Sequence, residues 1–579
     1  MKYKILSVFV SFILSLSASV ISIRLDDYPD KNLYLLANIL WYSVFLLLFS
    51  TFVKIKIKYK RYISFLKKHA FELSLLAIIT LTAAALRLIY LGSVPNVLGG
   101  DEGWTGMSAL KLFPAGQTMY NHPFSSFEGF GRQQLNIIRF FITLFGRNKF
   151  ALRLFFALGG ILSVHAVYLL ARYLFGKSVG LFSAFLIALS HIHIHFSRNA
   201  AVAYIHNNWL APLEIYFFLS GLAKKSTARL VLSALFLSLH FHYYYGGKII
   251  AGLLTVFLVI SFFINKKLLK GNFTKIALFF LSFFILILPE LFWSFNNPDD
   301  LKARWSKEGS FQSGWLYQKI NNENLSAPLI FYNRFKHVIK SVFILPARSF
   351  YNAPAPPVHR PVSIMFFIGL FYSLAKISKT KYLFLNLWLW SIALSIAVFA
   401  IPASADSYRI LMALPPILIL TALGWKLLIR LIRRIIRHRY VSVISTSLII
   451  FLIAFVNLKT YFFDFIAGCR YLEGSLRGRG VSLIGDLLRG QSPFTKAYFL
   501  GSDEYQYGLH SSLDYLAGEV EIDNMLTPFR PVADRGNLIF IIIPSREPEL
   551  ELVKRFAPSG KTYRVFDCTR LSFIAYRTK

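Results

Sequence analysis

NKFALRLFFALGGILSVHAVYLLARYLFGKSVGLFSAFLIALSHIHIHFSRNAAVAY is the sequence of residues 148–204. It contains two apolar runs, near 150–173 and 179–197. A helix needs roughly 20 apolar residues to cross a ~30 Å hydrocarbon core, so both runs predict membrane spans. Runs of this kind recur from the N-terminus to about residue 460. They predict about eleven spans, and the choice between eleven and twelve depends on whether 179–222 forms two.

The composition of the 579-residue chain agrees with a membrane protein. Hydrophobic residues make up 55% of it, and charged residues only 16%, whereas soluble globular domains carry about 25% charged residues. We therefore expect an α-helical polytopic membrane protein, with residues 1–460 as its transmembrane domain. Residues 461–579 lack further apolar spans and hold nearly equal numbers of acidic and basic side chains, which predicts a small soluble α/β domain.

The net charge of +36 is concentrated in particular loops. Residues 54–68 hold seven Lys or Arg and no acid, and residues 429–439 hold five Arg. The positive-inside rule makes these loops cytoplasmic. The loops 24–30, 93–149 and 296–360 and the C-terminal tail then face outward from a plasma (inner) membrane. Anionic lipid headgroups explain the basic loops, so we expect membrane lipids and no nucleic acid as partners.

Several segments outside the spans have their own predictions. The first twenty residues fit either a signal peptide or, as we favour, an uncleaved first helix. The end of the first large external loop, QLNIIRFFITLFG at 134–146, predicts a helix lying along the membrane surface. The loop 296–360 is rich in aromatic residues and is expected to form a second lid over the same face.

The soluble tail alternates short apolar strands with helical segments. Strands are expected at 496–501, 537–544, 561–567 and 571–577, and helices at 482–490 and 547–556. No GxGxxG or P-loop accompanies them, so we expect this domain to bind or cap the membrane domain rather than to act on nucleotides. Its side of the membrane also holds Cys469 and Cys568, whose spacing leaves a disulfide open.

The stretch LGGDEGWTG at 98–106 places two carboxylates, Asp101 and Glu102, directly after an apolar span. Only fourteen carboxylates occur in the first 460 residues, so an adjacent pair at the membrane surface is unusual. Such an Asp suits a general base that deprotonates an acceptor hydroxyl. A solvated loop, or Asp101 as the N-cap of the helix that follows, fits the spacing equally well.

Other polar residues lie inside or beside apolar runs. His191, His193 and His195 invite a metal reading, but only the first and last share a helix face, and no carboxylate completes the set. We therefore expect hydrogen-bonding histidines, leave a divalent cation open as the only candidate cofactor, and assign no metal ligand. Glu214 and Glu290 also lie within spans, where carboxylates are either functional or satisfied by a neighbouring helix.

The helix leading to the external Asp-Glu loop, together with residues 148–204, resembles the GT-C superfamily of multi-spanning glycosyltransferases. Within it the chain most resembles the branch of protein O-mannosyltransferases and lipid A aminoarabinose transferases (glycosyltransferase family 39-like), over roughly residues 71–428. The resemblance implies a GT-C-like fold and a catalytic base at Asp101, with Glu102 beside it. It also implies a polyprenyl-phosphate sugar as donor and a hydroxyl of a protein, lipid or glycan as acceptor.

The resemblance extends more loosely to three external turns. YYYGGK at 243–248 matches a Tyr-rich turn that ends in a basic residue, Lys248, NPDDLKARW at 297–305 matches a Pro…Arg segment with Arg304, and SYRILMALPPILIL at 407–420 contains the Tyr408–Arg409 turn. Basic side chains at headgroup depth grip phosphate. The expected donor-binding residues are therefore Arg198, His195, Lys248, Arg304, Tyr408 and Arg409. Snorkelling to the interface is the alternative for each basic residue.

One motif of the aminoarabinose transferases is absent. Their Lys-Pro-Pro stretch has SSFEGFGRQQL, residues 125–135, in its place, so the sugar and the acceptor stay open. The function expected is inverting transfer of a sugar to an acceptor hydroxyl on the outer side, as in cell envelope glycosylation. A transporter or flippase of lipid-linked saccharides is the alternative, although it predicts midplane charges and related halves. A membrane scaffold is a third hypothesis.

Overall fold

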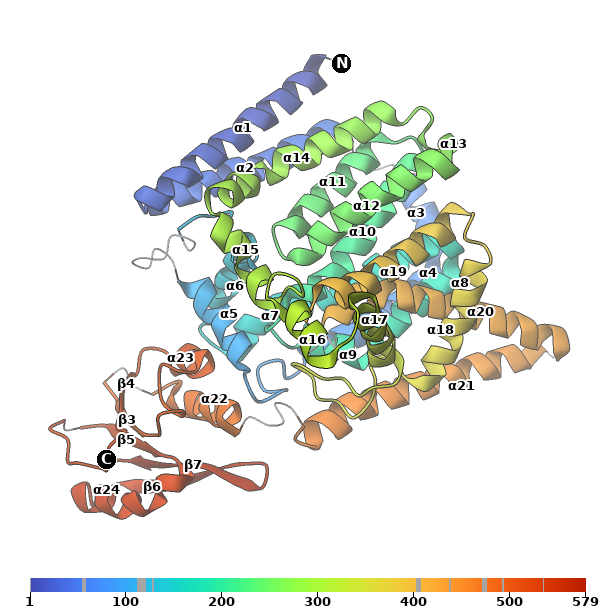
Figure 1. Cartoon of the computed structure of the whole chain (residues 1–579). Helices are drawn as coiled ribbons and strands as arrows, with labels where there is room; N and C mark the ends of the chain where they lie inside the picture. Colours follow the sequence, from blue (N-terminus) through green and yellow to red (C-terminus); the bar gives the residue numbers. More distant parts are fainter. Residues whose placement is uncertain are drawn as a thin grey trace.

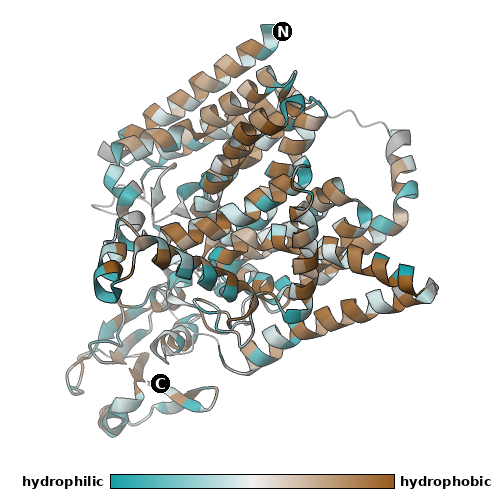
Figure 2. Cartoon of the chain, turned by 45° about the vertical axis from the view of Figure 1, so that its right-hand side comes forward, coloured by the Kyte–Doolittle hydropathy of each residue, from teal (hydrophilic) through white to brown (hydrophobic). Residues whose placement is uncertain are grey.

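The structure is a computed structural model that describes residues 2–54, 59–111, 121–127, 130–401, 408–436, 439–470, 476–491, 494–534 and 536–578. A helical bundle is formed by the chain up to Ala467, and a small sheet domain follows it (Figure 1). Figure 2 shows the bundle helices as mainly hydrophobic, with hydrophilic residues concentrated at their ends and in the C-terminal domain. This distribution is the one expected of helices surrounded by lipid.

Nine helices of the described part are long and apolar enough to cross a membrane, and ten if the bent pair α8 and α9 counts as one span. The first four helices are α1 (Lys2–Asp27), α2 (Lys31–Phe52), α3 (Tyr59–Lys68) and α4 (Ala70–Leu88). The external segment that follows holds α5 (Gly100–Leu110), the hairpin β1 (Ser126–Phe127) and β2 (Phe130–Gly131), and α6 (Arg132–Phe145). A multi-pass membrane protein is thus confirmed. The expected surface helix is α6.

The decisive stretch 148–204 forms three helices rather than two simple spans. They are α7 (Lys149–Phe175), α8 (Lys177–Leu189) and α9 (His191–Ser197), followed by the 3₁₀ turn η2 (Ala203–His206). The axes of α8 and α9 differ by 61° at the break, so the chain turns sharply at Ser190. Next come α10 (Asn207–Ala223), α11 (Thr227–Phe241), α12 (Tyr245–Ile264), α13 (Lys266–Leu269) and α14 (Phe273–Asn296).

The expected second lid, 296–360, is largely helical. It contains α15 (Pro298–Glu308), α16 (Trp315–Glu323) and α17 (Ala327–Phe343). The last bundle helices are α18 (Arg360–Leu374), α19 (Thr380–Phe399), the 3₁₀ turn η4 (Arg409–Ala413), α20 (Leu414–Ile435), α21 (Arg439–Leu458) and its π-helical continuation η5 (Lys459–Ala467). Figure 1 shows α20 and α21 as a hairpin that reaches away from the bundle.

A predicted span of 229–245 and the first half of 361–401 correspond to α11 and α18, which have only 15 residues each. Both are apolar but too short to pass as spans by length. The predicted span 203–222 likewise corresponds to α10, which has 17 residues and is not among the candidate spans. These three short helices explain why the described part has fewer spans than were predicted. The helices themselves were all predicted, and only their lengths differ.

The C-terminal domain is built on a five-stranded sheet with strand order β4-β3-β5-β7-β6. Its elements are α22 (Leu476–Leu488), β3 (Lys496–Leu500), α23 (Ser511–Ala517), β4 (Glu521–Asn524), β5 (Leu538–Ile542), the 3₁₀ turn η6 (Pro544–Glu549), α24 (Leu550–Phe556), β6 (Lys561–Asp567) and β7 (Arg570–Arg577). β3, β4 and β5 are parallel, and β7 is antiparallel to both β5 and β6. The four predicted strands are confirmed, and so is a helical bundle followed by a small α/β domain.

Candidate functional site

The Asp-Glu pair lies in the first turn of α5, in the segment between α4 and α7 that was predicted to be external. Gly99 rather than Asp101 is the N-cap, and its N–H donates to Glu102 Oε2 at 3.1 Å. The N-cap alternative for Asp101 is therefore wrong, because the helix begins at Gly100, before Asp101. Asp101 is exposed and Glu102 is buried. A carboxylate in the first turn is stabilised by the unpaired N–H groups and the helix dipole.

Glu102 is held by the bundle through both of its oxygens. Arg153 on α7 donates from Nε to Oε1 and from Nη2 to Oε2, each at 2.9 Å. The N–H of Ala200 also donates to Oε1 at 2.9 Å. Glu102 is 1% exposed and the Arg153 side chain 0%. Glu102 therefore anchors α5 to the bundle, and Asp101 is the exposed carboxylate of the pair.

The loop after Ala200 connects this anchor to a cavity. Tyr204 is four positions after Ala200, a distance of at most about 14 Å along an extended chain. Tyr204 lines a cavity of about 450 Å³ between α12, α15, α19 and η4. Asp101 is not among the described residues that line it. Ala200, which bonds Glu102 of α5, and Tyr204, which lines the cavity, thus belong to one short segment.

Two residues predicted to bind the donor, Lys248 and Arg409, line this cavity together, although 161 positions separate them in the sequence. The remaining wall combines polar and aromatic side chains with an apolar face of α19. The polar and aromatic residues are Tyr204, Tyr245, Glu308 and Gln312, and the α19 residues include Ile396 and Phe399. Two cations in a cavity with apolar walls form an environment suited to an anion attached to a lipid.

A carboxylate also occupies the cavity. Glu308, the last residue of α15, forms an ion pair with Arg409, and its side chain is 35% exposed. The chain next to it is fastened to the end of α19 by a bridge between Gly309 and Ala400 and by the Ser310 N–H, which donates to Phe399 O at 3.0 Å. These contacts hold Glu308 beside Arg409, the cation that an anionic ligand would need.

Tyr408 lies between the cavity and the bent pair α8 and α9. Its ring stacks on Tyr204, with centroids 5.7 Å apart, and meets the edge of Phe350 at 5.2 Å. The carbonyl of Phe350 is 2.8 Å from His195 Nε2. His195 is buried, so it reaches the cavity only through Phe350 and Tyr408. The donor-binding parts of Tyr408 and His195 stay predictions.

Two further predicted donor residues are placed elsewhere. Arg198 is buried, and its nitrogens donate to the carbonyls of Leu86, Ile89 and Val94 at 2.8 to 2.9 Å. Each guanidinium nitrogen thus has a backbone partner on α4 or in the segment that follows it, and Arg198 is not among the described residues that line the cavity. Its donor-binding part stays a prediction. Arg304 lies on α15, but its side chain is outside the described residues.

The three histidines of α9 serve as hydrogen-bonding residues, as expected. His191 Nδ1 is 2.8 Å from the Tyr351 hydroxyl, and its Nε2 is 3.1 Å from Pro356 O. Arg87 donates to His193 Nδ1 at 2.8 Å. These contacts fasten α9 to α4 and to the loop before α18. No group of three His, Cys, Asp or Glu within the described ranges has the arrangement of a metal site.

Sequence reasoning missed Arg153 and the partner of Lys248. Glu290 on α14 lies 2.9 Å from Lys248 Nζ and is 1% exposed. Glu214, the other carboxylate within a span, pairs with His240 at 2.8 Å. A signal for Arg153 was present, since a charged residue inside an apolar run usually has a buried partner. Its partner was 51 positions away, and nothing local indicated which carboxylate it would be.

The C-terminal domain packs against the helix that carries Asp101. A Cβ at Gly103 would lie 2.3 Å from the Ser512 backbone, and one at Gly106 would lie 2.5 Å from the Tyr515 ring. Glycine at both positions therefore lets α23 approach α5 closely. The Leu98 N–H also donates to Ser482 Oγ at 2.8 Å, so contacts with the tail are made on both sides of Asp101.

Arg147, between α6 and α7, strengthens the same contact. Its Nε donates to Tyr515 O at 2.6 Å, and its Nη2 donates to Asp514 O. Lys149 pairs with Asp486 on α22. Burial raises the pKa of the Asp514 carboxyl. Cations that lie against carbonyls and carboxylates thus add to the close packing of α23 on α5.

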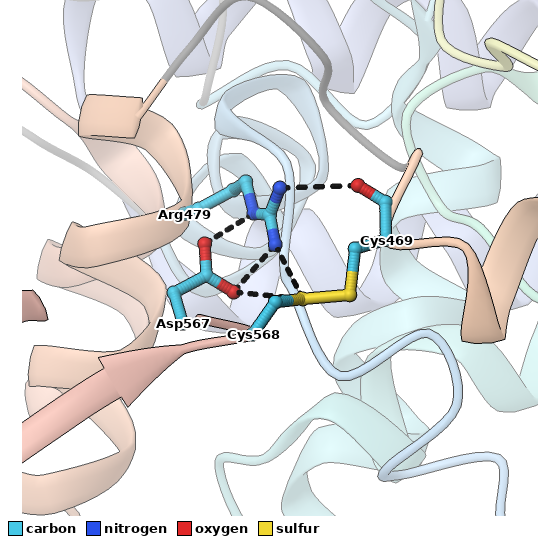
Figure 3. The surroundings of a disulfide bond; sticks show 4 residues. All are labelled: Cys469, Arg479, Asp567 and Cys568. Carbon is cyan, nitrogen blue, oxygen red and sulfur yellow. Dashed lines mark hydrogen bonds and ion pairs between the residues drawn. A yellow bond between two sulfur atoms is a disulfide. The ribbon is translucent and has the colours of Figure 1, made fainter. Parts of the chain in front are cut away.

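A disulfide between Cys469 and Cys568 connects the end of η5 to the turn between β6 and β7. Figure 3 shows Arg479 on α22 beside this bond. Arg479 donates to Cys469 O at 3.2 Å and pairs with Asp567 at 2.5 Å. The pairing that the sequence left open is therefore present, and Arg479 of α22 contacts both of its ends, through a hydrogen bond to Cys469 O and an ion pair with Asp567.

Comparison with known proteins was made by sequence and by structure. The model of the dolichyl-phosphate-mannose-protein mannosyltransferase family matches residues 135–293. No curated protein matches by sequence. The matched segment includes α6 through most of α14, and therefore Arg153, Lys248 and Glu290.

Among solved structures, the chain is similar to ArnT from Cupriavidus metallidurans in the apo state, with a TM-score of 0.52 and 13% identity over 86% of this chain and 97% of that one. ArnT from the same organism bound to undecaprenyl phosphate matches with a TM-score of 0.50, 13% identity and coverages of 88% and 98%. The Archaeoglobus fulgidus oligosaccharyltransferase in its apo form gives a TM-score of 0.46 at 16% identity, over 81% and 66%. The resemblance to GT-C glycosyltransferases of the mannosyltransferase and ArnT type is confirmed.

Proposed function

We propose that this protein is an inverting membrane glycosyltransferase that moves a sugar from a polyprenyl-phosphate donor to an acceptor hydroxyl. The observation that carries the proposal is the cavity in which Lys248 and Arg409 meet beside apolar α19. The fold shared with ArnT, one structure of which is bound to undecaprenyl phosphate, supports the donor class. The external side of a plasma membrane follows from the basic loops, which the positive-inside rule assigns to the cytoplasm.

The donor phosphate would bind between Lys248 and Arg409. Arg offers a planar fork of N–H groups that matches phosphate oxygens, and Lys adds a compact charge. The guanidinium of Arg409 lies 5.0 Å from the Tyr408 ring centroid, which fixes its plane. Glu308 would leave Arg409 when the phosphate arrives, because the two anions compete for one cation.

The polyprenyl tail would leave the cavity beside a small apolar groove of about 40 Å³. The groove is formed by α17, α18, α19, η4 and α20, with side chains such as Val342, Phe366 and Trp390. Ile396 of α19 belongs to both the groove and the cavity. A lipid phosphate with its head at Arg409 would therefore have apolar side chains beside the start of its tail.

Asp101 would act as the general base. It takes the proton from the acceptor hydroxyl while the hydroxyl oxygen attacks the anomeric carbon. The bond between that carbon and the phosphate oxygen breaks, and polyprenyl phosphate leaves as a stable anion that needs no acid. Glu102 and Arg153 hold the first turn of α5, so Asp101 is kept at the external surface where an acceptor arrives.

The test uses the purified full-length protein with a panel of polyprenyl-phosphate sugars and measures release of polyprenyl phosphate. Wild type should release it, and Asp101→Asn should reduce the rate by at least about 100-fold, the usual contribution of a general base. Asp299→Asn is the matched control, because Asp299 is also an exposed carboxylate in the first turn of an external helix. Activity of Asp101→Asn equal to that of the control would exclude Asp101 as the base. Transbilayer movement of lipid-linked sugar without release would point to a flippase.

A further inference from the structure

The buried carboxylate Glu290 sits between two basic side chains. Lys248 Nζ is 2.9 Å from Oε1, and His242 Nδ1 is 3.0 Å from Oε2. Glu290 and His242 are each 1% exposed, whereas the Lys248 side chain is 25% exposed. Lys248 alone of the three lines the cavity. The three residues form a row that runs from the packed interior to the cavity wall.

The position of Glu290 follows from a proline in α14. Pro289 has no N–H, so the carbonyl four residues earlier, Ile285 O, loses its helical donor. Ser15 Oγ of α1 donates to that carbonyl at 2.5 Å. The next carbonyl, Leu286 O, accepts from Trp41 Nε1 of α2 at 2.8 Å. These bonds fix α14 against α1 and α2 at the turn that presents Glu290.

His242 has an acceptor at each ring nitrogen. Its Nε2 lies 3.0 Å from Leu286 O, and its Nδ1 faces the Glu290 carboxylate. A neutral imidazole can donate from only one nitrogen, while imidazolium donates from both. The other neighbours of the ring are aromatic, with Trp41 at 4.8 Å and Phe124 at 6.0 Å between centroids. Only imidazolium can donate to both of these acceptors at once.

The charges of the row decide what Lys248 offers to a ligand. If Glu290 faced Lys248 alone, their two charges would cancel, as they do in the pair of Glu308 and Arg409. With His242 as imidazolium, one carboxylate is shared by two cations, and a charge of +1 remains. Lys248 is the member that reaches the cavity, so the remaining charge is presented there.

We propose that His242 is a positioning residue for the donor site: it neutralises Glu290 from behind, so that Lys248 is held in place yet keeps its positive charge for the donor phosphate. This inference rests on the proposed function, since it assigns the cavity to a lipid phosphate. It explains why the carboxylate of Glu290 does not cancel the positive charge of Lys248. Glu290 orients Lys248, and His242 offsets the charge of Glu290.

Binding of undecaprenyl monophosphate to the full-length protein in phosphatidylcholine nanodiscs tests the proposal. His242→Gln should lower the affinity about tenfold, because Glu290 then neutralises Lys248. The double variant His242→Gln/Glu290→Gln should return to within about threefold of wild type, because the charge of +1 is restored. A purely structural part for His242 would make the double variant at least as weak as the single one.

The buried pair His240 and Glu214 supplies the matched control, since it has the same chemistry and no residue in the described lining of the cavity. His240→Gln should bind the lipid phosphate as wild type does. Wild-type affinity in His242→Gln, or no recovery in the double variant, would overturn the inference alone. Absence of binding by wild type would overturn the proposed donor class together with it.

A second route avoids dependence on the folding of His242→Gln. Glu290→Gln removes the only carboxylate that could cancel the charge of Lys248 and should bind no more than about threefold more weakly than wild type, while Lys248→Met should lose at least about tenfold. Affinity in Glu290→Gln as low as that in Lys248→Met would contradict the charge balance. Thermal unfolding of each variant in the same nanodiscs shows whether its fold is retained.

Discussion

Arg153 and Glu102 face each other with two parallel N–H···O contacts of 2.9 Å, and both side chains are buried at the end of α7. The pair joins the helix that carries Asp101 to a bundle helix that the family model matches. Of the two carboxylates in the motif, Asp101 is thus the exposed one, and the buried Glu102 holds the helical turn that carries it.

Glu102→Gln should destabilise the protein by about 3–5 kcal/mol, because it leaves the Arg153 charge buried without a counterion. The measurement is the free energy of unfolding, or the thermal midpoint where unfolding is irreversible. Glu323→Gln, which removes a half-exposed partner of Lys319 on α16, should change stability by no more than about 0.5 kcal/mol. Equal effects of the two substitutions would contradict an anchoring part for Glu102.

Glu308→Gln should bind undecaprenyl monophosphate more tightly than wild type, by about threefold to tenfold, because the competing carboxylate of Arg409 is gone. The same nanodisc titration measures this gain. Glu323→Gln serves again as control, since it removes one carboxylate from the same external loop outside the cavity. Weaker binding in Glu308→Gln would mean that Glu308 helps to hold the ligand rather than competing with it.

Gly103→Ala should loosen the contact between α5 and α23 and reduce sugar transfer, since its Cβ would lie 2.3 Å from the Ser512 backbone. Gly100→Ala, on the same helix with nothing within 4 Å of the new Cβ, should leave transfer unchanged. Limited proteolysis of the C-terminal domain and the transfer rate report the two effects separately. Normal transfer together with a loosened domain would show that α23 does not position Asp101.

Replacing both Cys469 and Cys568 by Ser should make the C-terminal domain easier to release. The disulfide closes a segment with a sequence separation of 99 residues, for which chain-entropy arguments give about 3–5 kcal/mol. Protease susceptibility of residues 476–578 should rise in the variant and in reduced wild type alike. No change on reduction would mean that α22 and α23 hold the domain without the disulfide.

Much of the fold could be predicted from local sequence. Spans follow from apolar runs, and β3, β5, β6 and β7 follow from alternating or continuous apolar residues. β4 was missed because Glu521–Asn524 is a short, mostly polar edge strand whose pairing with β3 only the folded sheet reveals. The bend at Ser190 was missed because α8 and α9 read as one apolar run.

The candidate site could be predicted only in its residue types. Lys248 and Arg409 were expected at external helix ends, and the fold brings them to one cavity. Their carboxylate partners could not be predicted, because Glu290 and Glu308 lie 42 and 101 positions away and reach them only through tertiary packing. Arg198 has the same residue type as Arg409, but it caps the carbonyls at the end of α4.

The contact between α5 and α23 can form only after both segments of the chain have been synthesised. Residues 98–106 leave the ribosome early, whereas Ser482, Ser512 and Tyr515 are among the last fifth of the chain to be made. A product released before that point can insert its spans, yet the helix that bears Asp101 lacks its cover. Chains that stop before Ser482 are therefore expected to insert into the membrane and to show none of the proposed sugar transfer.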